Sequence, residues 1–322
     1  MLARPGSLYD VAMRAVSYDR YGGVDVLTLG STADPEISVD EILIEVRAAS
    51  LNPFDWKLRN GMLREYVATE FPVIPGRDGC GKVVTLGDAA GDAGLAKGQL
   101  VSFISSRVQH GSMAELAAVT AKEYAVPAAS TLSVEESAAL PLVGLSAFNA
   151  IVDTGQVRAG MRVLIHGGSG GVGSVAIQLA RYFGAEVFAT CSSRNAERVA
   201  MLGARPIAYD LVDFTTAVAD CDLVLDVIGG RVHEASYKVL KKGGRLVYLL
   251  AAPFDDRSEQ YGVETIQAEV FGHPANLAKV IELAGQGVIK PVIGHSLEID
   301  EFRTAFQLSE SGNAGGKIVL TV

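Results

Sequence analysis

The hydrophobic pattern of the chain changes part-way along. Up to about Pro127, short β-like runs such as EILIEVRAAS (41–50), GKVVTLG (81–87) and QLVSFIS (99–105) are separated by glycine, proline and aspartate. Such spacing is typical of a compact, mostly β domain. The first run is MRAVSY (13–18), and residues 1–12 show no periodicity. We therefore expect residues 1–12 to be an N-terminal extension with the character of a disordered segment.

After Pro127 the pattern becomes helical and then alternates. SVEESAALPLVGLSAFNAIVDTG (133–155) predicts a helix, with Ser133 and Glu136 spaced as a capping box. Beyond it, apolar runs alternate with helical segments, as in a parallel sheet that is buried on both faces. The expected strands are 162–166, 186–190, 206–209, 222–227, 245–250 and 266–271. Six such strands predict an α/β, doubly wound Rossmann sheet.

The end of the chain returns to the first pattern. A helix is expected over 276–285, an amphipathic segment over 302–308 and a closing strand in GGKIVLTV (315–322). The Rossmann domain is therefore expected to be inserted into the β domain. The predicted division is an extension (1–12), a β domain (13–126), a nucleotide-binding domain (127–272) and a return to the β domain (273–322).

A glycine motif follows the first Rossmann strand and opens a helix, at Gly168, Gly170 and Gly173. In this position the first two glycines allow a tight turn and close approach of a pyrophosphate, and the third allows close helix–sheet packing. The amide groups at the helix start stabilise the phosphates. The motif lies within a complete βαβ unit, so it predicts a bound dinucleotide.

The second strand of this unit ends in Ser192-Ser193-Arg194 rather than in an acid. Sites that prefer NAD usually place Asp or Glu there, about 20 residues beyond the glycines, to bind the ribose 2′-hydroxyl. Hydroxyl groups and a guanidinium instead donate hydrogen bonds to a 2′-phosphate. These residues at the tip of the strand therefore predict NADPH as the cofactor. Arg194 can also be interpreted as a solvated residue that caps the next turn.

Composition excludes several classes of function. The net charge of −9 gives no basic stripe for nucleic acid. Three cysteines without a Cys-x-x-Cys pair indicate free thiols in a reducing compartment. The N-terminus has no secretory signal, and the apolar stretch 138–152 is interrupted by Pro141, Gly144 and Ser146, too short for a membrane span. We expect a cytoplasmic protein.

Several segments together carry a family resemblance. They are AASLNPFDWKLRNG (48–61), PVIPGRDGCGKVVTLG (72–87), AALPLVGLSAFNAI (138–151), the glycine motif, LGARPIAYD (202–210) and GNAGGKIVL (312–320). In this order the chain after Met13 resembles the zinc-free quinone oxidoreductases of the medium-chain dehydrogenase/reductase superfamily, which include enone reductases. The resemblance implies a GroES-like catalytic domain with an inserted Rossmann domain, NADPH as reductant, and quinones or α,β-unsaturated carbonyls as acceptors. It also implies a homodimer that pairs through the edge of the Rossmann sheet.

The same resemblance assigns a set of cofactor-binding residues. Some line the pyrophosphate, some surround the 2′-phosphate, and others pass the nicotinamide ring or close over the cleft. They are Ser146, Gly168, Ser169, Gly170, Gly171, Val172, Gly173, Ser192, Ser193, Arg194, Tyr209, Leu250, Phe271, Asn313 and Lys317.

Asn52 and Lys57 are the candidate catalytic residues. By resemblance Asn52 lies near the nicotinamide and the acceptor carbonyl, and Lys57 matches a subgroup with the pattern NP-D-K. The acceptor oxygen gains negative charge as hydride arrives, so Asn52 would donate a hydrogen bond to it. Lys57 would supply positive charge or orient the ribose. From the residues alone, Asn52 is equally a turn residue before Pro53, and a solvated loop is the favoured interpretation of Lys57.

No metal is expected. The zinc branch of the superfamily needs a Gly-His-Glu segment and closely spaced cysteines, whereas this chain has Gly76-Arg77-Asp78 and scattered histidines. His166, which closes a buried strand, is expected to be structural.

Two alternative functions remain open. Reduction of 2-enoyl thioesters uses the same hydride chemistry, although the acidic net charge does not favour a carrier rich in phosphates. A redox sensor or structural protein that binds NADPH with little turnover is also compatible with the fold, since function resides in the site.

Overall fold

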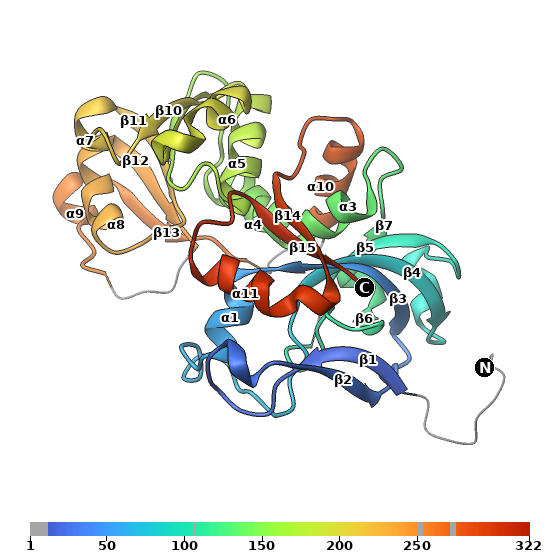
Figure 1. The fold of residues 1–322 in the computed structure, drawn as a ribbon. Helices are drawn as coiled ribbons and strands as arrows, with labels where there is room; N and C mark the ends of the chain where they lie inside the picture. The colour runs from blue at the N-terminus through green and yellow to red at the C-terminus, as the bar shows by residue number, and fades with distance from the viewer. Residues whose placement is uncertain (1–11, 106, 250–253, 271–274) are drawn as a thin grey trace.

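The computed structural model describes residues 12–105, 107–249, 254–270 and 275–322. Figure 1 shows two parts, each built on its own sheet. The yellow-to-orange part at the upper left contains a parallel sheet, and the blue-to-cyan part below it is rich in antiparallel strands.

The parallel sheet has six strands in the described part of the chain, in the order β10-β9-β8-β11-β12-β13. Its strands are β8 (Arg162–Ile165), β9 (Glu186–Cys191), β10 (Arg205–Ala208), β11 (Cys221–Asp226), β12 (Leu240–Tyr248) and β13 (Glu264–Gln267). This is the doubly wound Rossmann order, and the direction of winding reverses between β8 and β11, where such sheets bind their ligands. The predicted α/β class is therefore confirmed.

The last predicted strand is shifted. The structure places β13 at Glu264–Gln267 rather than at 266–271. Among the described residues, its neighbour β12 ends at Tyr248, which pairs with Gln267, and residues 268–270 form no strand. Strand formation depends on this pairing, which the apolar pattern alone does not reveal.

The predicted helix over 133–155 is divided. It consists of α3 (Val134–Ala139), α4 (Pro141–Phe148) and a π-helical turn (Asn149–Thr154). Pro141 begins α4 because proline has no amide hydrogen to continue the helix before it. The capping box is confirmed, since Ser133 Oγ accepts from the Glu136 amide at 3.1 Å and Glu136 Oε2 accepts from the Ser133 amide at 3.0 Å.

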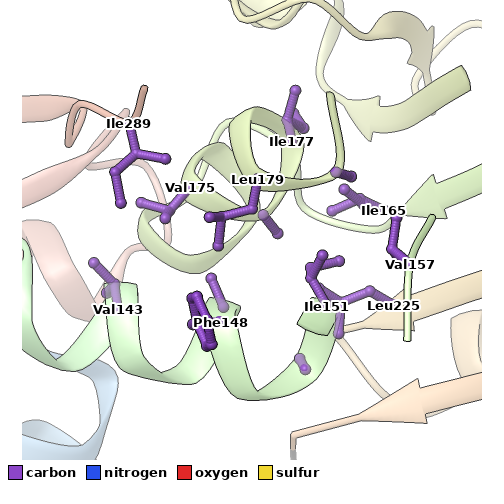
Figure 2. Packing of buried hydrophobic residues seen from close by; sticks show 14 of the residues in the cluster. Val143, Phe148, Ile151, Val157, Ile165, Val175, Ile177, Leu179, Leu225 and Ile289 are labelled. Atoms are coloured by element: carbon purple, nitrogen blue, oxygen red, sulfur yellow. The ribbon is translucent and has the colours of Figure 1, made fainter. Parts of the chain in front are cut away.

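One apolar core of this part includes the contact between α4 and helix α5 (Gly171–Tyr182). Figure 2 shows Val143 and Phe148 of α4 facing Val175 and Leu179 of α5. The remaining helices are α6 (Ala196–Met201), α7 (Phe214–Ala217), α8 (Arg231–Ser236), α9 (Ser258–Tyr261) and α10 (Ala275–Gly285). This apolar contact fixes the start of α5, where the glycine motif lies.

The second sheet joins distant parts of the sequence. Its order is β14-β15-β3-β4-β5-β7, with β6 paired to β3. Its strands are β3 (Glu41–Leu51), β4 (Asp78–Leu86), β5 (Leu100–Ile104), β6 (Leu116–Thr120), β7 (Ala125–Pro127), β14 (Ile293–Glu298) and β15 (Lys317–Thr321). The red C-terminal strand β15 lies beside the blue β3, so the tail returns to the N-terminal sheet (Figure 1).

Three short helices and a two-stranded ribbon complete this part. They are α1 (Pro53–Arg59), α2 (Ala121–Tyr124), α11 (Phe302–Glu310), β1 (Ala12–Ser17) and β2 (Thr28–Ala33). Arg59 at the end of α1 is buried and donates to Glu310 Oε1 at 2.6 Å and to the Gly22 carbonyl at 3.1 Å. These contacts hold α1 against α11 and so fix the position of Asn52, the residue that caps α1.

Candidate active site

The glycine turn packs tightly against its neighbours and leads into the start of α5. A Cβ on Gly168 would lie 2.7 Å from the Ala189 Cβ, and one on Gly173 would overlap the Gly167 carbonyl. Gly170 caps α5 without a side-chain hydrogen bond, and the first turn of α5 has no acidic residue. The amides at the start of α5 are thus suited to an anion such as a pyrophosphate.

Lys317 connects this turn with the other sheet. A Cβ on Gly171 would lie 2.9 Å from the Lys317 Cδ, so the lysine stem runs directly against the turn. The buried ammonium donates to the Leu51 carbonyl at 3.1 Å and to Asn52 Oδ1 at 2.6 Å. Burial lowers the pKa of Lys317, whereas the carboxylates of Asp78 and Asp55 act in the opposite direction.

Asn52 is held on both sides of its amide. Its oxygen accepts from Lys317, and its Nδ2 donates to Asp78 Oδ1 at 2.7 Å and to the Ser50 carbonyl at 3.3 Å. The residue is buried. Both amide hydrogens therefore have acceptors, and the long contact to Ser50 is the one that a ligand oxygen would replace most easily.

Asp78 ties the two parts of the molecule together. Its Oδ2 accepts from the Leu142 amide at 3.0 Å, in the first turn of α4, while its Oδ1 accepts from Asn52. The side chain is fully buried. The sequence predicts Asp78 only as part of the segment that replaces a zinc-binding one, and no local pattern indicates the distant amide from which it accepts.

Asp55 fixes the start of α1. Its two carboxylate oxygens accept from the Asn52 amide at 2.8 Å and the Gly76 amide at 2.9 Å. Burial raises the pKa of Asp55 to about 6, while the two amide hydrogen bonds and Arg77 act to lower it. The Asn-x-x-Asp spacing of a capping box was visible in the sequence and could have revealed this residue.

Lys57 occupies a different environment from Lys317. It is half-buried on α1, with its Nζ 5.6 Å from the centre of the Trp56 ring. Burial lowers the pKa of Lys57. The lysine that contacts the Asn52 side chain is Lys317, so the catalytic role of Lys57 stays a prediction.

The tip of β9 meets a loop from the C-terminal part of the chain. Arg194 donates to Asn313 Oδ1, and Arg198 donates to the Gly315 carbonyl. The structure thus brings together Arg194 and Asn313, two residues that the resemblance assigns to the cofactor.

Asn195 connects the tip of β9 with the glycine turn. Its Nδ2 donates to Ser169 Oγ at 3.2 Å and to Ser192 Oγ at 3.1 Å. Asn195 was not among the predicted site residues, although it directly follows Arg194. Asn195 therefore holds two predicted cofactor residues, Ser169 and Ser192, side by side.

A carboxylate also lies at this tip. Asp210 follows β10, and its Oδ1 and Oδ2 accept from the Ser193 amide at 2.8 Å and the Ser193 hydroxyl at 2.6 Å. Tyr209, beside it, is 64% exposed. The second strand ends without the acid that NAD-preferring sites usually place there, but the structure supplies Asp210 from the end of the third strand.

The other predicted residues have varied surroundings. Ser146 is buried and donates to the Leu142 carbonyl at 2.8 Å within its own helix. Val172 packs against the core between α4 and α5. Leu250 and Phe271 lie outside the described residues.

His166 is fully enclosed. Its Nδ1 lies 3.1 Å from Thr190 Oγ1, and its Nε2 lies 3.0 Å from Ser236 Oγ. Burial lowers the pKa of His166 to about 4. The ring is therefore neutral and hydrogen-bonded at both nitrogens, in agreement with the structural role expected for it.

The described residues hold no candidate metal site and no candidate membrane span. They contain no group of three or more His, Cys, Asp or Glu side chains placed to hold a metal ion. None of the helices in the same part of the chain is long and apolar enough to cross a membrane.

Known families match both parts of the chain. Residues 38–134 match the alcohol dehydrogenase GroES-like domain, and residues 202–320 match the family described as zinc-binding dehydrogenase. The 2-methylene-furan-3-one reductase of Solanum lycopersicum is 37% identical over 96% of this chain and 79% of its own. The NADPH-dependent alkenal/one oxidoreductase of Arabidopsis thaliana is 35% identical with the same coverage.

A solved structure agrees with these relatives. The quinone oxidoreductase of Coxiella burnetii superposes with a TM-score of 0.88 at 32% identity, over 97% of this chain and 99% of its own. The chain belongs to the quinone and enone oxidoreductases of the medium-chain dehydrogenase/reductase superfamily. As a member of this family it is an oxidoreductase that uses a nicotinamide cofactor. The predicted GroES-like domain with an associated Rossmann sheet is confirmed.

Proposed function

We propose that this oxidoreductase transfers hydride from NADPH to a quinone or an α,β-unsaturated carbonyl, without zinc. The observation that carries the proposal is Lys317, which runs along the glycine turn at Gly171 and ends on Asn52. A cofactor held by the turn would thus have its reactive end beside Asn52. Relatives named as a 2-methylene-furan-3-one reductase, an alkenal/one oxidoreductase and a quinone oxidoreductase homolog favour this class of acceptor.

The residues of the site fit a nicotinamide cofactor, which supplies the hydride when bound. The amides at the start of α5 would hold its pyrophosphate, because the first amides of a helix have no partner within the helix and lie at the positive end of its dipole. Ser192, Ser193 and Arg194 would contact a 2′-phosphate, with Arg194 exchanging its hydrogen bond to Asn313 for one to the phosphate.

Asn52 and Lys317 would stabilise the acceptor oxygen. Lys317 donates to the amide oxygen of Asn52 and so polarises the amide, which makes Nδ2 a stronger donor. An acceptor oxygen that displaces the Ser50 carbonyl would receive the Nδ2 hydrogen now donated to that carbonyl, and the hydrogen bond would strengthen as negative charge develops on the oxygen. The final proton would come from water, since enolates and hydroquinone anions are readily protonated.

The test is NADPH oxidation followed by absorbance, with a small 1,4-quinone and a short 2-alkenal as acceptors. Each reaction is repeated with NADH and with a metal chelator. We expect turnover that prefers NADPH and is unchanged by the chelator. Tight NADPH binding without turnover would instead favour a sensor, and loss of turnover with the chelator would contradict the zinc-free mechanism.

We also propose that the enzyme is a homodimer. β13 has only β12 as a neighbour among the described strands, which leaves one edge of the parallel sheet open to a second copy. Light scattering during gel filtration would distinguish a dimer from a monomer. Cytoplasmic location stays a prediction, because relatives include proteins named as chloroplastic or mitochondrial; the check is the location of the tagged chain in its own cell.

A further inference from the structure

Asp210, just beyond the end of β10, accepts hydrogen bonds from Ser193, just beyond the end of β9. The two strands are parallel and pair up to Ala208 and Cys191, so both end at the same edge of the sheet. Ser193 opens the short 3-10 helix Ser193–Asn195, and both its amide and its hydroxyl donate to Asp210. Arg194 follows in the same turn.

These donors are the ones that a 2′-phosphate would use. A phosphate monoester carries a charge of about −1.5 to −2 at neutral pH and needs several donors. Asp210 already occupies both donors of Ser193, so the two anions compete for them. The hydrogen bond from the Ser193 hydroxyl holds the pKa of Asp210 below its ordinary value, and Arg194 acts in the same direction. The carboxylate is therefore ionised when the phosphate arrives.

A ribose without the 2′-phosphate needs a hydrogen-bond acceptor here instead of donors. Its 2′-hydroxyl is a donor, and in NAD-preferring Rossmann sites it is bound by a carboxylate at this edge of the sheet. Asp210 supplies such an acceptor from the third strand instead of the second. One tip thus combines donors for a 2′-phosphate with an acceptor for a 2′-hydroxyl.

We propose that Asp210 sets the discrimination between NADPH and NADH, by competing with the 2′-phosphate for Ser193 and by accepting from the 2′-hydroxyl. The proposal rests on the cofactor-binding role proposed above for Ser193 and Arg194. With Asp210 in place, the preference for NADPH over NADH should be smaller than Ser193 and Arg194 would give without it. Asp210 is a specificity-determining residue, separate from the hydride-transfer chemistry at Asn52.

The direct test is binding of adenosine 2′,5′-bisphosphate and of AMP, measured by calorimetry at fixed ionic strength. Asp210→Asn keeps the shape of the side chain and removes its charge. We expect it to bind the bisphosphate about 5- to 20-fold more tightly, as removal of one like charge near a solvated phosphate allows. Binding of AMP should be unchanged or weaker. Asp210→Ser, which also removes the charge, should shift the ratio in the same direction.

Asp213 offers a matched control. It is exposed, lies three residues further along, and accepts from the Thr215 amide at 2.9 Å instead of contacting the tip. Asp213→Asn makes the same change in net charge. An equal tightening of bisphosphate binding in Asp213→Asn would show a general charge effect and overturn the proposal. Unchanged bisphosphate binding in both Asp210 variants would overturn it as well.

The binding test does not depend on turnover. If the wild type reduces no acceptor while Asp210→Asn binds the bisphosphate more tightly, the reductase proposal fails and the role of Asp210 stands. If the wild type is active, the ratio of kcat/KM for NADPH to that for NADH should rise in Asp210→Asn. If the enzyme is active but this ratio of kcat/KM values does not change in Asp210→Asn, the role of Asp210 is contradicted and the reductase proposal is not.

Discussion

Lys317 donates a hydrogen bond of 2.6 Å to the side-chain oxygen of Asn52, a residue 265 positions earlier in the chain. Both side chains are buried, and the lysine stem also contacts the glycine turn. One side chain therefore joins the cofactor-binding turn to the residue proposed to stabilise the acceptor.

Lys317→Met should lower kcat about 10-fold, equivalent to about 1.4 kcal/mol of transition-state stabilisation, with less than about a threefold change in KM for NADPH. Methionine keeps the apolar stem against Gly171 but cannot donate to Asn52. Steady-state kinetics with a saturating quinone provide the measurement. Lys57→Met is the matched comparison, and a larger loss of kcat in that variant would reverse the assignment of the two lysines.

Arg194→Ala should raise KM for NADPH about 10-fold more than KM for NADH, because a charge-assisted hydrogen bond to the 2′-phosphate is lost. Arg205→Ala is the control, since Arg205 begins β10 at the opposite end of the strand and pairs with Glu186. It should change neither KM. Equal effects of Arg194→Ala on both cofactors would remove this residue from the 2′-phosphate site.

His166 should make the protein less stable in acid. Its pKa is about 4 in the folded protein and 6.5 ordinarily, so the unfolded chain binds the proton first. The free energy of unfolding should therefore fall as the pH decreases from about 6.5 to 4, by up to about 3 kcal/mol from this residue. Urea unfolding of the wild type and of His166→Gln across this range measures the difference.

Comparison with the variant is necessary because Asp55 acts in the opposite direction. Its raised pKa of about 6 means that the folded state takes up a proton before the unfolded one. Stability from Asp55 therefore rises as the pH falls from about 6 towards 4. A wild type and a His166→Gln variant with parallel pH profiles would contradict the assignment of the acid sensitivity to His166.

Arg59→Ala should lower the free energy of unfolding by about 3 kcal/mol, since it removes a buried side chain and leaves its partners unsatisfied. It should also lower kcat, because α1 carries Asn52 at its start. Arg47→Ala is the control: Arg47 is exposed and pairs with Glu45 on the same strand, so its loss should cost less than about 0.5 kcal/mol. Chemical unfolding and kinetics measure both effects, and equal losses in the two variants would contradict the prediction.

The sequence was sufficient where the signal is local. The glycine motif, the capping box at Ser133 and the apolar strands of the Rossmann sheet each depend on neighbouring residues, and the structure contains all of them. The predicted range of β13 was wrong, because the end of this strand depends on the length of its neighbour β12.

The contacts that build the site join residues that are far apart in the sequence. Asp78 accepts from Leu142, 64 positions away, and Ser193 donates to Asp210, 17 positions away. An aspartate that will accept a distant amide has no local pattern that separates it from a solvated one. Such residues could be found from the sequence only after the paired strands were known, as with Asp210 at the end of β10.

The position of β15 in the sheet has a consequence for synthesis. This strand lies between β14 and β3 and carries Lys317, and the loop before it supplies Asn313 and Gly315 to the tip of β9. A growing chain emerges from its N-terminus, and domains generally fold as units in that order. The Rossmann sheet can therefore form on the ribosome before the site exists, and the ability to react is acquired only when the last strand joins the first sheet.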